Sequence, residues 1–150
     1  MSIKIILHDV RTIDDTFSKL TTKRFPNFKA VLQISKAASE IKTIRKSFDD
    51  QERAILLKYM KTSEDGNFVF NGNNLVPKST DPKDIAKLNK ELNDLHSTSV
   101  ELENLKEPLM LDYNDGLLDL TPNDLIALQG LVEIVFDEPT PENTKPADVN

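Results

Sequence analysis

The chain has 150 residues, of which 38% are hydrophobic and 29% are charged, and its formal net charge is −6. It has no Cys, which excludes disulfides, thiolate nucleophiles and Cys-ligated metal centres. No stretch approaches the roughly 20 apolar residues that span a bilayer, so we expect a soluble protein with a single folded domain over residues 1–136.

The N-terminal residues favour a short strand followed by a short helix. Apolar side chains alternate over residues 3–7, and charge follows too soon for this run to be a signal peptide. The spacing then predicts a helix over 12–20, with Thr12 as its N-cap and with Phe17 and Leu20 facing inward.

The clearest predicted element is an amphipathic helix over residues 28–61, with Asn27 as its N-cap. Apolar residues recur along it at seven-residue spacing: Ile34, Ile41, Phe48 and Ile55. Others fill the same face at offsets of three and four: Val31, Ala37, Ala38, Ile44 and Tyr59. Three pairs of opposite charge stand four residues apart and are expected to link along the exposed face: Lys36/Glu40, Lys46/Asp50 and Asp49/Arg53.

A second helix is predicted over residues 82–96, after a connector at 62–81. The connector has apolar residues on both sides of Asn71-Gly72, which favours a miniature hairpin. Asp81 is the expected N-cap of the second helix, and four apolar residues then form a coiled-coil-like seam: Ile85, Leu88, Leu92 and Leu95.

The C-terminal third predicts short elements and a tail. Residues 100–105 suit a continued helix or an alternating strand, and we favour the strand. Residues 110–118 are typical of strand, turn and strand. Thr121 is the expected cap of a short helix, with Pro122 at its first position. The helix is predicted over 125–129 and should end at Gly130 as its C-cap glycine, and residues 131–136 suit a closing strand or a helix extension. The acidic, proline-rich residues 137–150 predict a disordered tail.

These elements together predict an α+β fold that is mostly helical. The helices at 28–61 and 82–96 form an antiparallel hairpin of long helices. A small β element comes from the N-terminus and the 100–118 region.

No constellation of residues with catalytic, cofactor-binding or metal-binding character stands out, so we predict that the protein is not an enzyme. The segment from Asp112 to Gly116 resembles a calcium loop, but its second Asp and its glycine each fall one position early. The two histidines, His8 and His96, lie on different predicted elements. We therefore expect no cofactor, and no rise in melting temperature with zinc or calcium.

Charge is divided unevenly along the chain. Residues 1–63 hold 13 Lys and Arg and 7 Asp and Glu, a net charge of +6, whereas the remainder carries −12. The two halves either pair with each other or present faces of opposite sign to partners, and we favour internal pairing. The basic residues around the first long helix are a possible phosphate-binding face, but we interpret them as solvated and paired with acids. They are Lys23, Arg24, Lys42, Arg45, Lys46 and Arg53.

The order of elements resembles a family of uncharacterised small proteins encoded by tailed phages of Gram-positive bacteria. The resemblance covers residues 3–134. It includes a long helix that closes on a Tyr and an Asp-Gly turn, in the stretch FKAVLQISKAASEIKTIRKSFDDQERAILLKYMKTSEDGNFVF, and the helix start Leu120-Thr121-Pro122-Asn123-Asp124-Leu125. That family has no assigned active site, so the resemblance transfers no functional residues. It implies a phage setting, in which small acidic helical proteins are often virion or assembly parts.

From these observations we predict a phage-type structural or virion-assembly protein that acts through protein–protein contacts, in several copies. Its expected partners are other phage proteins or copies of itself, with no membrane, no small-molecule substrate and no nucleic acid. The expected location is the host cytoplasm, with incorporation in the virion as a further possibility. The alternatives are an inhibitor of a host enzyme or defence protein, and a nucleic-acid-binding accessory protein.

Overall fold

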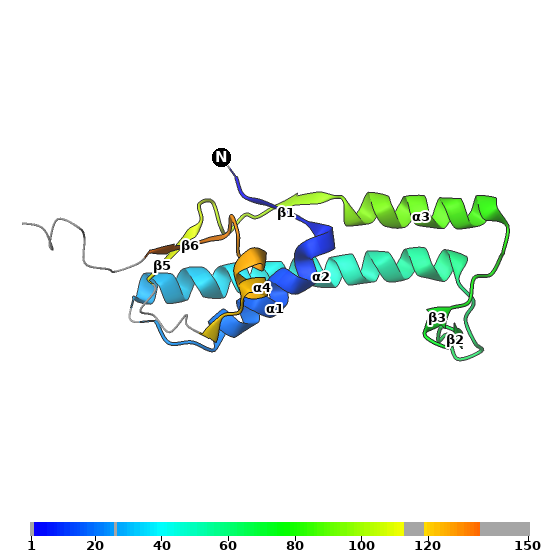
Figure 1. The fold of residues 1–150 in the computed structure, drawn as a ribbon, viewed down its shortest axis with the longest axis horizontal. Coiled ribbons are helices and arrows are strands. Elements are labelled where there is room, and N and C mark those ends of the chain that lie inside the picture. Colours follow the sequence, from blue (N-terminus) through cyan, green and yellow to red (C-terminus); the bar gives the residue numbers. More distant parts are fainter. Residues whose placement is uncertain (1, 26, 113–118, 136–150) are drawn as a thin grey trace, which may run out of the picture.

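A computed structural model describes residues 2–25, 27–112 and 119–135 of the chain, and it is an α+β fold dominated by helix (Figure 1). The elements in chain order are β1 (Lys4–Ile6), the 3₁₀ helix η1 (Leu7–Asp9), α1 (Val10–Thr21), α2 (Phe28–Tyr59), β2 (Phe70–Asn71), β3 (Asn74–Leu75), α3 (Pro82–His96), β4 (Ser99–Glu101), β5 (Leu109–Asp112), α4 (Pro122–Ala127) and β6 (Val132–Val135). No helix among the described residues is long and apolar enough to cross a membrane.

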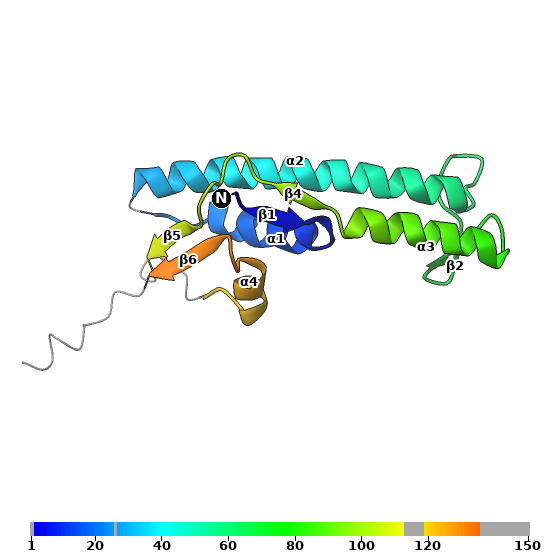
Figure 2. The same ribbon diagram turned by 90° about the horizontal axis from the view of Figure 1, so that it is seen from above.

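The long helix α2 organises the molecule. It begins after Asn27, whose side-chain oxygen accepts a hydrogen bond from the backbone N–H of Lys29 at 2.9 Å. Helix α3 begins after Asp81, which accepts from the N–H of Lys83 at 3.0 Å. The two helices run in opposite directions, and α3 lies along the C-terminal part of α2 (Figure 2). The predicted N-caps Asn27 and Asp81 are both confirmed.

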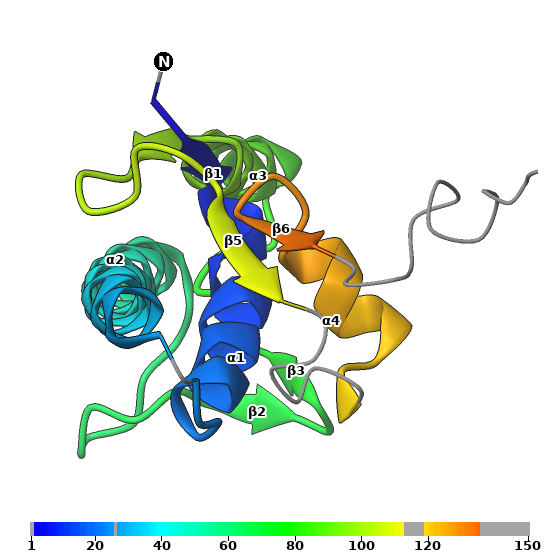
Figure 3. The same cartoon turned by 90° about the vertical axis from the view of Figure 1, so that its left-hand side faces the viewer.

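The other part of α2 is covered by α1, a contact that the sequence analysis did not anticipate. Seen along the long axis, α1 lies between α2 and α4 (Figure 3). Helix α1 begins at Val10 rather than near Thr12, which lies inside the helix and does not cap it. The reason is that Val10 is fully buried and belongs to the same apolar face as Phe17 and Leu20. The two-helix hairpin is thus only part of the architecture.

The strands form three two-stranded sheets among the described residues. Strands β1 and β4 pair antiparallel, with Ile5 opposite Val100, and the expected miniature hairpin is β2 with β3. The 100–118 region was predicted to form one β element with the N-terminus. Strand β4 does pair with β1, but β5 pairs in parallel with β6 instead. Leu109 and Leu111 of β5 are buried, so this strand places its apolar face on the core. The second predicted strand of 110–118 lies outside the described residues.

The predicted cap Thr121 is confirmed, and the helix after it spans Pro122–Ala127 rather than 125–129. Helix α4 begins at Pro122, because Thr121 and Asp124 form a capping box in which each side chain accepts from the other residue's backbone N–H. Gly130 is not the C-cap that was predicted, because the helix ends at Ala127 with Leu128 as its C-cap. Gly130 lies in the turn that follows and has a φ of 81°, a left-handed conformation that favours glycine. Residues 132–135 then form a strand, the first of the two alternatives. The predicted tail at 137–150 lies outside the described residues.

One cluster of buried apolar side chains joins η1, α1, α2 and the end of α3 to the strands β1 and β5. The seven-residue spacing of α2 supplies its centre: Ile34, Ile41 and Phe48 are at most 2% exposed. Ile55 is partly buried against the same cluster. The predicted face of α2 is confirmed at these positions, but Val31 is 39% exposed.

Candidate functional site

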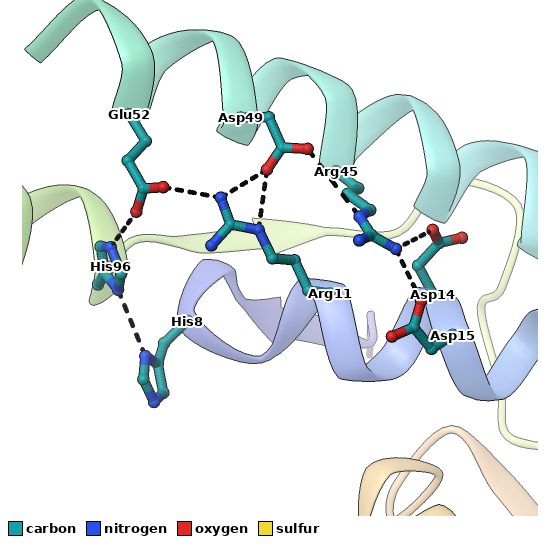
Figure 4. A network of polar contacts seen from close by, with 8 residues as sticks. All are labelled: His8, Arg11, Asp14, Asp15, Arg45, Asp49, Glu52 and His96. Carbon is teal, nitrogen blue, oxygen red and sulfur yellow. Dashed lines mark hydrogen bonds and ion pairs between the residues drawn. The ribbon is translucent and has the colours of Figure 1, made fainter. Parts of the chain in front are cut away.

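A network of charged side chains joins α1 to α2, and its centre is Arg11 (Figure 4). The Arg11 guanidinium donates to Asp49 Oδ1 from Nε at 2.9 Å and from Nη2 at 2.7 Å. Nη2 also donates to Glu52 Oε1 at 2.7 Å. The guanidinium carbon lies 4.7 Å from the centre of the Phe48 ring, so the cation also rests on the edge of the core.

A second cationic centre of the network is Arg45. Its Nη1 donates to Asp14 Oδ2 and to Asp15 Oδ1, each at 2.8 Å. Asp14 is only 3% exposed, and Lys42 Nζ approaches its other oxygen at 3.3 Å. Hydrogen bonds to Asp14 and then to Asp15 raise the pKa of Arg45 above its ordinary value. A buried carboxylate needs such partners, because its desolvation is otherwise uncompensated.

The network also brings together the two histidines that the sequence left apart. His96, at the end of α3, places Nε2 at 2.7 Å from Glu52 Oε2, and its ring makes a T-shaped contact with the Phe48 ring with the centroids 5.2 Å apart. His8, in η1, lies on the other side of His96, with the two Nδ1 atoms 3.4 Å apart (Figure 4). Side chains from η1, α2 and α3 thus meet at one point.

The electrostatics of this point depend on Glu52. Burial raises the pKa of its carboxyl, but the hydrogen bonds from Arg11 and His96 lower it by more, and the net pKa is below the ordinary value of about 4.5. A carboxyl with a lowered pKa in the folded state stabilises the fold above its unfolded pKa. This stabilisation is lost as the pH falls through the folded pKa.

We therefore expect Glu52→Gln to weaken the acid sensitivity of the protein. Between pH 6 and pH 3 the melting temperature of the wild type should fall further than that of the variant, because the glutamine side chain of the variant cannot take up a proton. Thermal unfolding followed by circular dichroism at a series of pH values measures this difference. Asp50→Asn is the matched control, since Asp50 is 66% exposed and its salt bridge is to its helix neighbour Lys46. A Glu52→Gln profile parallel to the wild type would contradict the assignment.

The charge pairs predicted along α2 are only partly present. Lys46 and Asp50 are paired at 3.1 Å, as expected. Glu40, however, accepts from the backbone N–H groups of Glu103 and Asn104 at 2.6 and 2.8 Å, and so holds the loop after β4. Asp49 pairs with Arg11 of α1, a residue that the sequence analysis did not single out.

The candidate phosphate-binding cations are largely engaged with protein groups. Lys42 and Arg45 meet Asp14, and the Arg53 guanidinium lies 5.2 Å from the centre of the Phe68 ring. Three pairs also connect the basic first half of the chain with the acidic second half: Lys19–Asp124, Lys23–Asp119 and Lys58–Glu91.

Apolar side chains are exposed at several places among the described residues, and two of these surfaces have at least two such side chains each. The first, which we call the α2 tip patch, consists of Phe28, Val31 and Leu32, with exposed fractions of 75%, 39% and 44%. The second is a groove of about 740 Å³ between β1 and α4, whose apolar rim includes Ile6 and Ile126, 46% and 68% exposed. Both surfaces offer apolar area to a partner.

The described residues contain no group of three or more His, Asp or Glu side chains placed to hold a metal ion. The calcium-like segment after Asp112 lies outside them. No protein family, curated protein or solved structure matches the chain.

Proposed function

We propose that this chain is a phage-type structural or assembly protein that acts in several copies through protein–protein contacts. The observation that carries the proposal is the pair of apolar surfaces, the α2 tip patch and the β1–α4 groove. They lie on different elements, so a contact between the patch of one copy and the groove of the next is a head-to-tail contact. Head-to-tail contacts close into rings or continue as filaments, which suits a multicopy component.

The contacts within the polar network favour a structural role for its residues over a catalytic one. The carboxylates of Asp14, Asp49 and Glu52 each contact a guanidinium, and the cations are held by the neighbouring helix. Such pairs fix the position of α1 on α2. The same engagement of Lys42 and Arg45 reduces the positive charge that a nucleic-acid backbone would meet, which favours a protein partner over the nucleic-acid alternative.

The phage setting of this proposal rests on the resemblance over residues 3–134. Within it, an inhibitor of a host enzyme or defence protein would use similar exposed surfaces. Mass spectrometry of purified particles separates the two roles. A virion part is present at fixed stoichiometry, whereas an inhibitor is absent from the particle.

The contribution of the α2 tip patch can be tested by light scattering on the purified chain. Burying one large apolar side chain contributes about 1.5–3 kcal/mol, so Phe28→Gln with Leu32→Gln should weaken self-association by at least about tenfold. Leu57→Gln is the control, because Leu57 is 38% exposed near the other end of α2. Equal association of the wild type and the double variant would contradict a role for this patch.

A further inference from the structure

The distance between the two histidines is unusual for a hydrogen bond. Their Nδ1 atoms are 3.4 Å apart, whereas an N–H donor ordinarily lies about 2.7–3.2 Å from its acceptor. Tetrahedral zinc binds imidazole nitrogen at about 2.0–2.1 Å, which places two nitrogen ligands roughly 3.3–3.4 Å from each other. The separation of His8 and His96 therefore matches that of two ligands on one tetrahedral ion.

The second observation is the way in which Glu52 orients His96. The carboxylate accepts a hydrogen bond from Nε2 at 2.7 Å, so the proton of the neutral ring resides on Nε2 and the lone pair on Nδ1. A carboxylate in this position is the usual outer partner of a metal-binding histidine, where it fixes both the tautomer and the ring orientation. The edge contact with Phe48 restrains the same ring.

The charge and the access of the site also suit a cation. The carboxylate next to His96 is that of Glu52, whose other oxygen is paired with Arg11. His8 is exposed and the His96 side chain is 31% exposed, which leaves a path from solvent to the space between the rings.

We propose that His8 and His96 form a two-imidazole binding site for a divalent first-row transition metal such as Zn²⁺, with both Nδ1 atoms as ligands and water in the remaining positions. The ion would fasten η1 to the end of α3, beside the sheet of β1 and β4. Imidazole ligands favour Zn²⁺ and Cu²⁺ over the hard cations Mg²⁺ and Ca²⁺. The proposal replaces the sequence-based expectation that zinc does not raise the melting temperature. The same expectation for calcium is unchanged.

Zinc titration of the full-length chain without a histidine tag tests the proposal. We expect one Zn²⁺ per chain by isothermal titration calorimetry and a rise in melting temperature of at least about 2 °C at saturation, reversed by a chelator. MgCl₂ should have no such effect. Because the chain has only two histidines, ¹⁵N NMR of the imidazoles should show both Nδ1 signals shifting together.

The decisive variant is His8→Gln, because His8 is exposed and its replacement leaves the Glu52–His96 contact in place. It should fold as the wild type does and bind Zn²⁺ at least about tenfold more weakly, since one of two ligands is lost. His96→Gln should have the same effect on binding. An equal zinc response in the wild type and His8→Gln would assign the ion to other groups and overturn the proposal, as would no binding to the wild type below about 1 mM.

Discussion

Replacing Ile41 by Asp should unfold the protein or lower its stability by several kcal/mol. Ile41 has no exposed surface and lies at the centre of the buried face of α2. A carboxylate there would lose its hydration without gaining a partner, and this cost is comparable to the whole stability of an ordinary domain. Thermal unfolding followed by circular dichroism measures the loss.

The control for this experiment has to be chosen from the structure. On sequence alone Lys42→Asp is expected to be harmless, with a cost below about 0.5 kcal/mol, because Lys42 lies on the polar face. Its Nζ, however, approaches the buried carboxylate of Asp14 at 3.3 Å, so an Asp at position 42 would add repulsion there. Ala54→Asp is the better control, because Ala54 is exposed on the same helix. Equal melting temperatures for Ile41→Asp and Ala54→Asp would show that the buried face is assigned wrongly.

Removing the Arg45 side-chain charge should have the second largest effect. Arg45→Met leaves the Asp14 carboxylate, 3% exposed, with only the longer contact to Lys42. Breaking a buried pair costs about 3–5 kcal/mol, and the 31% exposure of the Arg45 side chain reduces the expected loss to roughly 2–3 kcal/mol. Urea unfolding measures this loss.

The double variant Asp14→Leu with Arg45→Met distinguishes the effect of losing the ion pair from the effect of altered side-chain packing. It removes both charges, so it should recover most of the stability that Arg45→Met loses. Lys46→Met is the control, since Lys46 is 78% exposed and pairs with Asp50 along the helix. A loss for Arg45→Met no larger than that of Lys46→Met would contradict a structural role for the buried pair.

Local signals in the sequence predicted the helices well. Asn27, Asp81 and Thr121 each precede a helix and cap it through a side-chain oxygen, because capping depends on residues only two or three positions apart. The seven-residue spacing likewise identified the buried centre of α2. These features need no knowledge of how distant segments meet.

The features that depend on distant segments were missed. His8 and His96 are 88 positions apart, and nothing near either residue indicates the other. The parallel partner of β5 was also missed, because β6 follows only after a crossover that includes α4.

One long-range signal was nevertheless present in the order of charges. Along α1 an arginine precedes two acids, Arg11 before Asp14 and Asp15. Along α2 the order is the same, with Arg45 before Asp49 and Glu52. Because the two helices run antiparallel, each arginine meets the acids of the other helix (Figure 4).

Sedimentation velocity tests the central proposal, self-association or partner binding through exposed apolar surface, most directly. The wild-type chain should show a sedimentation coefficient that rises with concentration up to about 100 µM in low salt, because exposed apolar patches favour contacts between copies. Added salt should weaken the association where charge contributes. A clean monomer at about 100 µM in low salt, with no binding of a dye for exposed apolar surface, would contradict the assembly role.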